Sequence, residues 1–393
     1  MSEPQIGRHR LLKDLNHKAV LDLLAGQGSL SRVDISDRLT LSQASVSRIV
    51  ESLSNAGLVR EEGLVASRPG RPQVLVGVDP GAASVASVNL RPGQLRARLA
   101  DLLGAVIAEV EVRTEKPLSA SQRADQVVTQ VLGLLRDQPA AGELVALTVG
   151  VAAAWDDVNG RVYAARTQGT LEGVDLVGLL RERLAAAAPD PLQEGVTIEV
   201  DNDVNLAASG ESVAGVASGE DDFFYLSLGS GVGGAVMANG TLYRGVVGFA
   251  GEIGYLQMRD RRGRPTDLEQ RVSTAALQVA LRAAGSVDDP CDVLSRDSHD
   301  AAEERVIAEF AEDVAVAIGA VTALLNPRLV VLGGALGSCC ERLLPRIDSV
   351  LRERLPVTPK VVVSRLGRDV ALVGGLASAL TNARVRLLRT RLD

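Results

Sequence analysis

The spacing of apolar residues divides the chain into a helical head and a longer body. Between residues 16 and 58, apolar side chains recur at helical intervals in three stretches, NHKAVLDLLAGQG, SLSRVDISDRL and SQASVSRIVESLSNAGL. From Gln73 onward, apolar strands alternate with helical stretches, including a predicted helix over 120–136 and the strand ELVALTVGVAA. A comparable series follows Val196. The pattern predicts a three-helix head and an α/β body of two lobes separated by a cleft.

The third helical stretch has one apolar face and one small polar face. Its inward stripe is Val46, Ile49, Val50 and Leu53. The start of its exposed face consists of small side chains, one amide and one guanidinium: Ser42, Gln43, Ala44, Ser45, Ser47 and Arg48. Such a face fits the major groove of DNA. The alternative is a three-helix bundle whose polar face is merely solvated.

Two features after the third helix favour DNA binding. The stretch LVREEGLVA predicts a short hairpin that turns at Glu62 and Gly63, as the wing of a winged helix requires. The following SRPGRP segment is extended because its prolines exclude helix, so Arg68 and Arg71 are expected to contact phosphates or a minor groove. A stiff linker between domains is the alternative for this segment, and the two roles are compatible. The predicted head covers residues 1–72.

The distribution of charge supports this division. The whole chain has a net charge of −7, but residues 1–72 hold ten Lys and Arg against eight Asp and Glu, a net +2 that leaves −9 for the rest. A mildly basic head on an acidic body suits a DNA-binding module attached to a part that does not contact DNA. The N-terminal residues are charged, and no run of about 18 uncharged apolar residues occurs. We therefore expect a cytoplasmic protein without membrane segments.

Composition limits what can fill the cores and what can bind metal. Aromatic residues make up only 2% of the chain, so Val, Leu and Ala must fill the cores. Cys291, Cys339 and Cys340 show neither metal-ligand spacing nor a disulfide framework, since neighbours in sequence rarely pair. We expect all three to be reduced and partly buried.

Four segments resemble regulators of the ROK group (repressors, open reading frames and kinases). They are the head with its Arg-Pro-Gly-Arg-Pro linker, VDNDVNLAASGES, LSLGSGVGGAVMANGTLYRGVVGFAGEIGY and VVLGGALG. The resemblance implies a winged helix-turn-helix followed by a duplicated, ribonuclease-H-like actin-type ATPase fold that binds a sugar or sugar phosphate between its lobes. The first lobe is then expected at 73–200, completed by a C-terminal helix at about 370–390, and the second at 201–369.

The same resemblance implies a set of sugar contacts. Asn202 and Asp203 are expected to meet sugar hydroxyls, and Asp203 stands at the position of the catalytic base in family kinases. Glu252 and Glu269 match two acids that grip the sugar, Glu252 near its anomeric end. Tyr255 replaces an expected histidine, and its hydroxyl can hydrogen-bond in the same place. From the residues alone, the Asp-Asn-Asp tripeptide favours an ordinary turn after a strand, and each glutamate could be an ordinary surface carboxylate.

Two departures from the family pattern bear on its chemistry. The Asp-x-Gly-x-Thr phosphate loop of the kinases reads Asp-Pro-Gly-Ala-Ala over residues 79–83, which lacks the hydroxyl and one backbone N–H. Residues 229–234 keep a glycine-rich phosphate-loop pattern with Ser230 in place of Thr. The family's zinc-binding His and Cys segment is replaced by LQMRDRRGRPTDLEQ, which has neither residue type. We expect no metal, no cofactor and no kinase activity.

These observations predict a sugar- or sugar-phosphate-responsive repressor of carbohydrate-metabolism genes. It is expected to bind double-stranded operator DNA as a homodimer or homotetramer, with sugar binding between the lobes repositioning the paired heads. One alternative is an ATP-dependent sugar kinase that carries a regulatory head. Another is an adaptor that binds a protein partner through its head.

Overall fold

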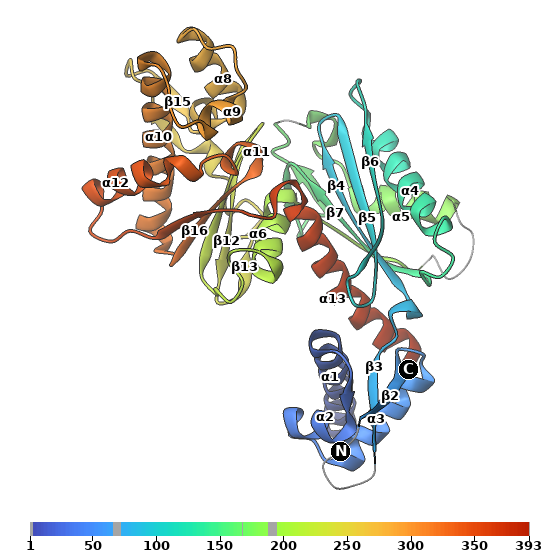
Figure 1. Cartoon of the computed structure of the whole chain (residues 1–393). Helices are drawn as coiled ribbons and strands as arrows, with labels where there is room; N and C mark the ends of the chain where they lie inside the picture. The colour runs from blue at the N-terminus through green and yellow to red at the C-terminus, as the bar shows by residue number, and fades with distance from the viewer. Residues whose placement is uncertain (1–2, 66–71, 167, 188–194, 393) are drawn as a thin grey trace.

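A computed structural model describes residues 3–65, 72–166, 168–187 and 195–392 and shows a small head beside two α/β lobes (Figure 1). The elements of the head are α1 (Glu3–Gln27), β1 (Leu30–Ser31), α2 (Arg32–Leu39), α3 (Gln43–Asn55), β2 (Val59–Val65) and β3 (Gln73–Val78). None of the described helices is both long and apolar enough to cross a membrane.

Local capping fixes the two short helices of the head. The Ser31 hydroxyl accepts a hydrogen bond from the Asp34 backbone N–H at 3.2 Å, and the Asp34 carboxylate accepts one from the Ser31 N–H, a reciprocal capping box that starts α2. Ser42 caps α3 by accepting from the Ser45 N–H at 3.1 Å. The predicted apolar stripe of α3, from Val46 to Leu53, is buried. The three predicted helices are therefore confirmed.

The wing differs from the prediction. β2 does not turn at Glu62 and Gly63 but continues as one strand, with a bulge there, and pairs antiparallel with β3. The bulge explains the error, because an inserted residue with Gly63 at φ 142° resembles a turn in sequence. β3 also pairs with β1, so 73–78, predicted to open the first lobe, belongs to the sheet of the head. Arg68 and Arg71 lie outside the described residues.

The first lobe is a five-stranded sheet covered by two helices of its own and by the C-terminal helix of the chain. Its elements are η1 (Pro80–Ala82), β4 (Ser84–Arg91), β5 (Gln94–Asp101), β6 (Val106–Arg113), α4 (Ala120–Arg136), β7 (Leu144–Val151), β8 (Ala154–Asp156), β9 (Arg161–Tyr163), η2 (Gly169–Leu171), α5 (Leu176–Ala187) and β10 (Thr197–Asn202). The strand order is β10-β7-β4-β5-β6, parallel from β10 to β4 and antiparallel from β4 to β6. β8 and β9 form a separate hairpin.

The second lobe repeats this arrangement. Its elements are α6 (Asp203–Ala214), β11 (Phe223–Leu228), β12 (Val232–Ala238), β13 (Thr241–Tyr243), η3 (Ile253–Tyr255), β14 (Gln257–Arg259), β15 (Pro265–Asp267), α7 (Glu269–Val272), α8 (Thr274–Ala283), α9 (Pro290–Ser295), α10 (Ala301–Leu325), β16 (Leu329–Gly333), α11 (Gly334–Gly337), η4 (Glu341–Leu343), α12 (Leu344–Arg354), β17 (Lys360–Val363) and η5 (Gly367–Asp369). Its strand order, β13-β12-β11-β16-β17, is again part parallel and part antiparallel about a central strand. This repetition confirms the predicted duplicated fold.

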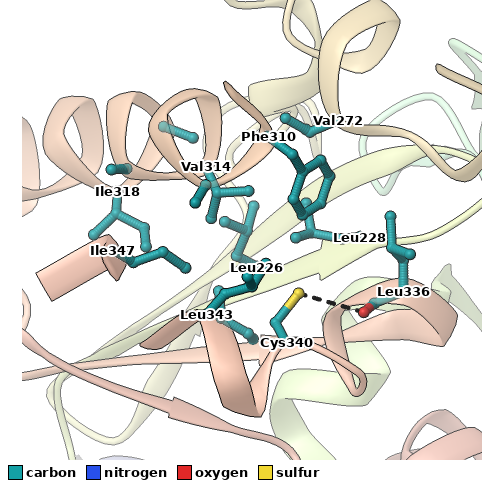
Figure 2. Packing of buried hydrophobic residues seen from close by; sticks show 14 of the residues in the cluster. Leu226, Leu228, Val272, Phe310, Val314, Ile318, Leu336, Cys340, Leu343 and Ile347 are labelled. Carbon is teal, nitrogen blue, oxygen red and sulfur yellow. Dashed lines mark hydrogen bonds between the residues drawn. The ribbon is translucent and has the colours of Figure 1, made fainter. Parts of the chain in front are cut away.

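The core of the second lobe is almost entirely aliphatic, as the low aromatic content predicts. Leu226 and Leu228 of β11 pack against Phe310 and Val314 of α10 (Figure 2). Cys340 is buried in this core, and its thiol donates to the Leu336 carbonyl. This agrees with the prediction for that cysteine.

The prediction of reduced thiols is wrong for the other two cysteines. A disulfide joins Cys291 of α9 to Cys339 after α11, with their Cα atoms 5.4 Å apart. The two residues are separated by 48 positions. Only the packing of α9 beside α11 brings them together, and sequence spacing does not reveal that contact.

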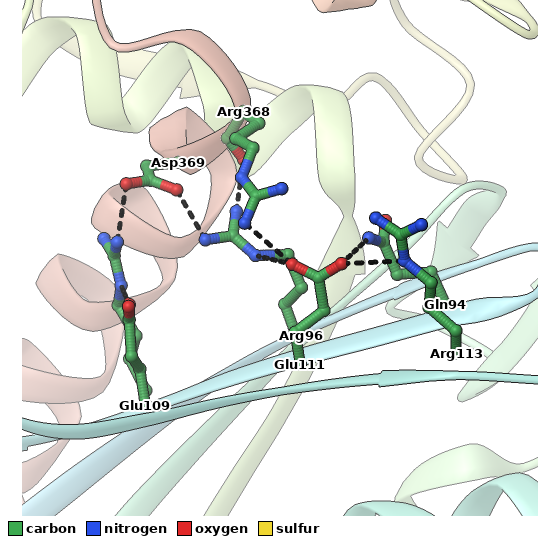
Figure 3. A network of polar contacts seen from close by, with 8 residues as sticks. Gln94, Arg96, Glu109, Glu111, Arg113, Arg368 and Asp369 are labelled. Atoms are coloured by element: carbon green, nitrogen blue, oxygen red, sulfur yellow. Dashed lines mark hydrogen bonds and ion pairs between the residues drawn. The ribbon is translucent and has the colours of Figure 1, made fainter.

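The last helix, α13 (Val370–Leu392), runs from between the lobes to the head (Figure 1). The turn η5 directly before it is joined to the first lobe by a network of charges, in which Asp369 pairs with Arg96 at 2.7 Å and with Arg98 at 2.5 Å (Figure 3). Farther along, its apolar side chains share one core with the head and the back of the first lobe. Arg384 of α13 also pairs with Asp22 of α1 at 3.3 Å.

Candidate functional site

The start of α3 presents a polar face to solvent. Gln43, Ala44, Ser47 and Arg48 are exposed, and Arg48 has no ion-pair partner among the described residues. Ser42 is also exposed, whereas Ser45 is half-buried because it takes part in the cap of the helix. The structure therefore leaves the predicted DNA-contacting side chains of the helix free, with Ser42 and Ser45 partly engaged by the cap. In the helix-turn-helix geometry such a face contacts base edges.

A cavity of about 360 Å³ lies between the two lobes. All five predicted ligand-binding residues line it. Its polar side chains are Arg91, Arg166, Asn202, Asp203, Ser227, Ser230, Glu252, Tyr255, Glu269 and Thr274. A concave site with a few convergent polar groups is typical of small-molecule binding.

Asn202 and Asp203 stand where β10 ends and α6 begins. The Asn202 side chain caps α6 by accepting from the Val204 N–H at 2.8 Å, and its amide N–H donates to Glu252 at 3.0 Å. Asp203 is buried, and its carboxylate accepts from the Arg91 guanidinium at 3.2 Å. Burial raises the pKa of Asp203 above its usual range, while the Arg91 charge opposes that shift. The sequence therefore positions a carboxylate and an amide side by side on the cleft floor.

Glu252 and Glu269 face this floor from the second lobe. Gly251 lets the turn that carries Glu252 lie close to β12: it has φ 90°, and a Cβ there would lie 2.0 Å from the Gly234 carbonyl oxygen. Burial, followed by the charges of Glu269 and Asp203, raises the pKa of Glu252 to about 7. Glu269 is held by the Val232 N–H at 3.1 Å. These carboxylates can accept several hydrogen bonds from vicinal hydroxyl groups.

Arg166 of the first lobe closes the other side of the cavity. Its guanidinium lies 3.5 Å from the centre of the Tyr255 ring and 3.3 Å from both Asp267 and Glu269. Below the floor, Asp201 is buried and pairs with Arg244 at 2.6 Å. Sequence reasoning missed these arginines and Arg91, because an arginine in a loop or at the end of a strand carries no pattern that separates a cavity residue from a solvated one.

The phosphate loop predicted at residues 79–83 is not at the cavity. These residues form η1 and its flanks between the head and the first lobe, and Asp79 pairs with Arg60 of the head at 3.3 Å. The turn that does reach the cavity from the first lobe joins β4 to β5 and contributes Arg91 and Pro92. In sequence, each of the two segments is a strand followed by a turn that contains proline and glycine and then by another strand. The prediction therefore took the wrong one of two similar turns.

The second predicted phosphate loop does reach the cavity. Gly229, Ser230 and Gly231 line it. In contrast, the region of the expected zinc segment is held by ion pairs: Arg261, in the hairpin of β14 and β15, and Arg271, in the following helix α7, both pair with Asp313 of α10. Among the described residues, no group of three His, Cys, Asp or Glu side chains is arranged to hold a metal.

Comparisons with known proteins identify the family. The profile of the ROK family matches residues 94–382, more than half of the chain. The chain belongs to the ROK family. A profile of the MarR family matches residues 13–66 in the head.

Several relatives of this ROK chain match along nearly their whole length. The xylose repressor of Caldicellulosiruptor bescii is 24% identical, over 96% of this chain and 98% of the relative. The N-acetylglucosamine repressor of Escherichia coli O157:H7 is 26% identical, over 89% of this chain and 87% of the relative.

Solved structures confirm the fold. A ROK family transcriptional regulator, described as a homologue of the E. coli MLC protein, superposes with a TM-score of 0.77 at 21% identity, over 97% of this chain and 99% of that one. A ROK family glucokinase from Streptomyces griseus, solved with glucose and AMPPNP, superposes with a TM-score of 0.62 at 23% identity. It covers 76% of this chain and 100% of its own. The fold therefore hosts both regulators and kinases.

Proposed function

We propose that this protein is a sugar-responsive transcriptional repressor that binds operator DNA through α3 and a sugar in the cleft between the lobes. The observation that carries the proposal is that one chain joins a free DNA-contacting face to a cleft lined by Asn202, Asp203, Glu252 and Glu269. Relatives that match over nearly the full chain are named as repressors, in agreement with this pairing of sites. Homodimers or homotetramers would place two heads on a pseudo-palindromic operator.

The two sites are linked by α13. Near the cleft it packs on α6, whose first residue is Asp203, and at its other end it shares a core with α1 and the end of α3. A change in lobe closure that shifts α6 therefore has a rigid route to the head. Coupling between two sites through such an element is typically about 1–3 kcal/mol.

A sugar kinase is the second candidate, and the Gly229–Gly231 turn on the cavity favours it. Two features of the first lobe oppose it. Arg91 already occupies the Asp203 carboxylate that would accept the proton of the attacking hydroxyl, and Pro92 removes a backbone N–H from the neighbouring turn. We infer that Asp203 binds the ligand and does not act as a base.

The test measures both activities on the full chain. Fluorescence anisotropy with DNA from the protein's own upstream region, with and without a panel of sugars and sugar phosphates, should show binding that one ligand class changes. An ATP-dependent phosphorylation assay on the same panel should stay at background. Turnover of about 1 per second or more, the lower end of kinase rates, would favour the kinase. Absence of sequence-preferring DNA binding would contradict the repressor and favour the protein-binding adaptor.

A further inference from the structure

The chain has nine aromatic residues, and their placement is uneven. Five of them, Trp155, Phe223, Phe224, Tyr225 and Phe310, are buried. Of the four that are not buried, three form a continuous row of rings, and the fourth, Tyr243, is in no ring pair among the described residues. Because aliphatic side chains fill most of the cores, a row of partly exposed rings calls for a separate explanation.

The row consists of Tyr163, Phe249 and Tyr255. The centres of the Tyr163 and Phe249 rings are 6.1 Å apart and the rings are nearly parallel, at 26°. Phe249 and Tyr255 are 5.4 Å apart at 53°. Both distances are those of favourable aromatic pairs. Phe249, the middle ring, is nevertheless 41% exposed, so part of its surface is open to a further contact.

One end of this row lies in the cleft, and the other two rings lie beside it. Tyr255 lines the cavity, and the Phe249 carbonyl accepts a hydrogen bond from the N–H of Glu252 at 3.3 Å. The backbone around Phe249 is held in place, because the Tyr163 hydroxyl donates to the carbonyl of Val247. Neither Tyr163 nor Phe249 lines the cavity itself. Phe249 therefore adjoins the cavity lining through Tyr255 and keeps part of its ring exposed.

We propose that Tyr163, Phe249 and Tyr255 form an accessory subsite for the second ring of a disaccharide whose first ring occupies the cleft. One face of a pyranose ring is largely C–H, and such a surface packs on an aromatic ring while its hydroxyls stay hydrated. Phe249 supplies that apolar surface directly outside the polar cavity. The subsite makes a disaccharide, or a longer saccharide bound by two units, the preferred effector. This inference rests on the proposed sugar-binding function of the cleft.

The experiment compares one-ring and two-ring sugars on the full chain by isothermal titration calorimetry. The probes are glucose and xylose against cellobiose, maltose and xylobiose, and the quantity of interest is the ratio of monosaccharide Kd to disaccharide Kd. For the wild type we expect a ratio of about ten or more for at least one matched pair, the effect of one good ring contact. Phe249→Ala should lower that ratio about tenfold, and Phe249→Trp should preserve it. Tyr243→Ala, which removes an exposed ring outside the row, is the matched control and should leave it unchanged.

The outcomes separate this inference from the function on which it rests. If monosaccharides bind and shift operator affinity while disaccharides bind no better, the subsite is refuted and the sugar-responsive function stands. If Phe249→Ala weakens both sugar classes equally, the rings only hold the two lobes together, and the subsite is again refuted. If neither these sugars nor the sugars and sugar phosphates of the wider panel bind or change operator affinity, the proposed function fails and the subsite fails with it.

Discussion

The close crossing of α6 and α13 can be tested by mutation, because the backbones of the two helices are in contact at Gly210 and Gly374. A Cβ on Gly374 would lie 1.8 Å from the Leu206 carbonyl oxygen, which is 1.2 Å inside the 3.0 Å that real Cβ atoms keep. Neither partner is a flexible side-chain end, so Gly374→Ala must push the helices apart. Overpacking of this kind typically costs about 1–3 kcal/mol. The gain in helix propensity from Gly to Ala offsets about 1 kcal/mol at most.

Gly133 of α4 provides the matched control, because a Cβ there would meet nothing within 4 Å. Gly133→Ala should be neutral or stabilising by up to about 1 kcal/mol. The two variants should then differ by about 2 kcal/mol, or roughly 4–8 °C in the thermal midpoint for lobes of this size. Differential scanning calorimetry measures the difference. Equal midpoints for Gly374→Ala and Gly133→Ala would refute the close crossing.

Three further predictions concern the two sites. Arg48→Ala or Gln43→Ala should weaken operator binding by about 1–3 kcal/mol in anisotropy titrations, the value of a lost base contact, and unchanged affinity for both would refute the assignment of the α3 face. Asp203→Asn should lower sugar affinity by about 1.5–3 kcal/mol in calorimetry, since it replaces a charged acceptor and loses the Arg91 pair, and should leave a repressor that binds DNA without responding to sugar. Because the folded-state pKa of Glu252 is raised to about 7, the folded protein takes up a proton as the pH falls through 7, whereas the unfolded chain does so only near 4.5. Lowering the pH from 8 to 6 should therefore stabilise the wild type by about 1 kcal/mol more than Glu252→Gln in urea titrations, and identical pH dependence would count against a buried acid.

The elements that could be predicted from sequence were those with a strong local signal. Helix α4 begins and ends at the predicted residues 120 and 136, and a capping box of Ser119 and Gln122 fixes its start. The stripe of α3 was predictable from the helical spacing of its apolar residues. The wing was not, since β2 pairs with a strand beyond the connection that contains Arg68 and Arg71, and a glycine bulge resembles a turn when the pairing partner is unknown.

The residues of the cleft were likewise predictable only where the sequence around them carries a local signal. Family motifs placed Asn202, Asp203 and Glu252 correctly on its lining, because each follows a strand or glycine turn whose geometry is fixed locally. The positive charges that determine how those acids behave come from elsewhere: Arg91 is 112 residues from Asp203 in sequence, and Arg166 is 103 residues from Glu269. A carboxylate paired with an arginine differs in pKa and in hydrogen-bonding capacity from an isolated one. The motif therefore locates the acids on the cavity lining, whereas the distant arginines that pair with them are known only from the fold.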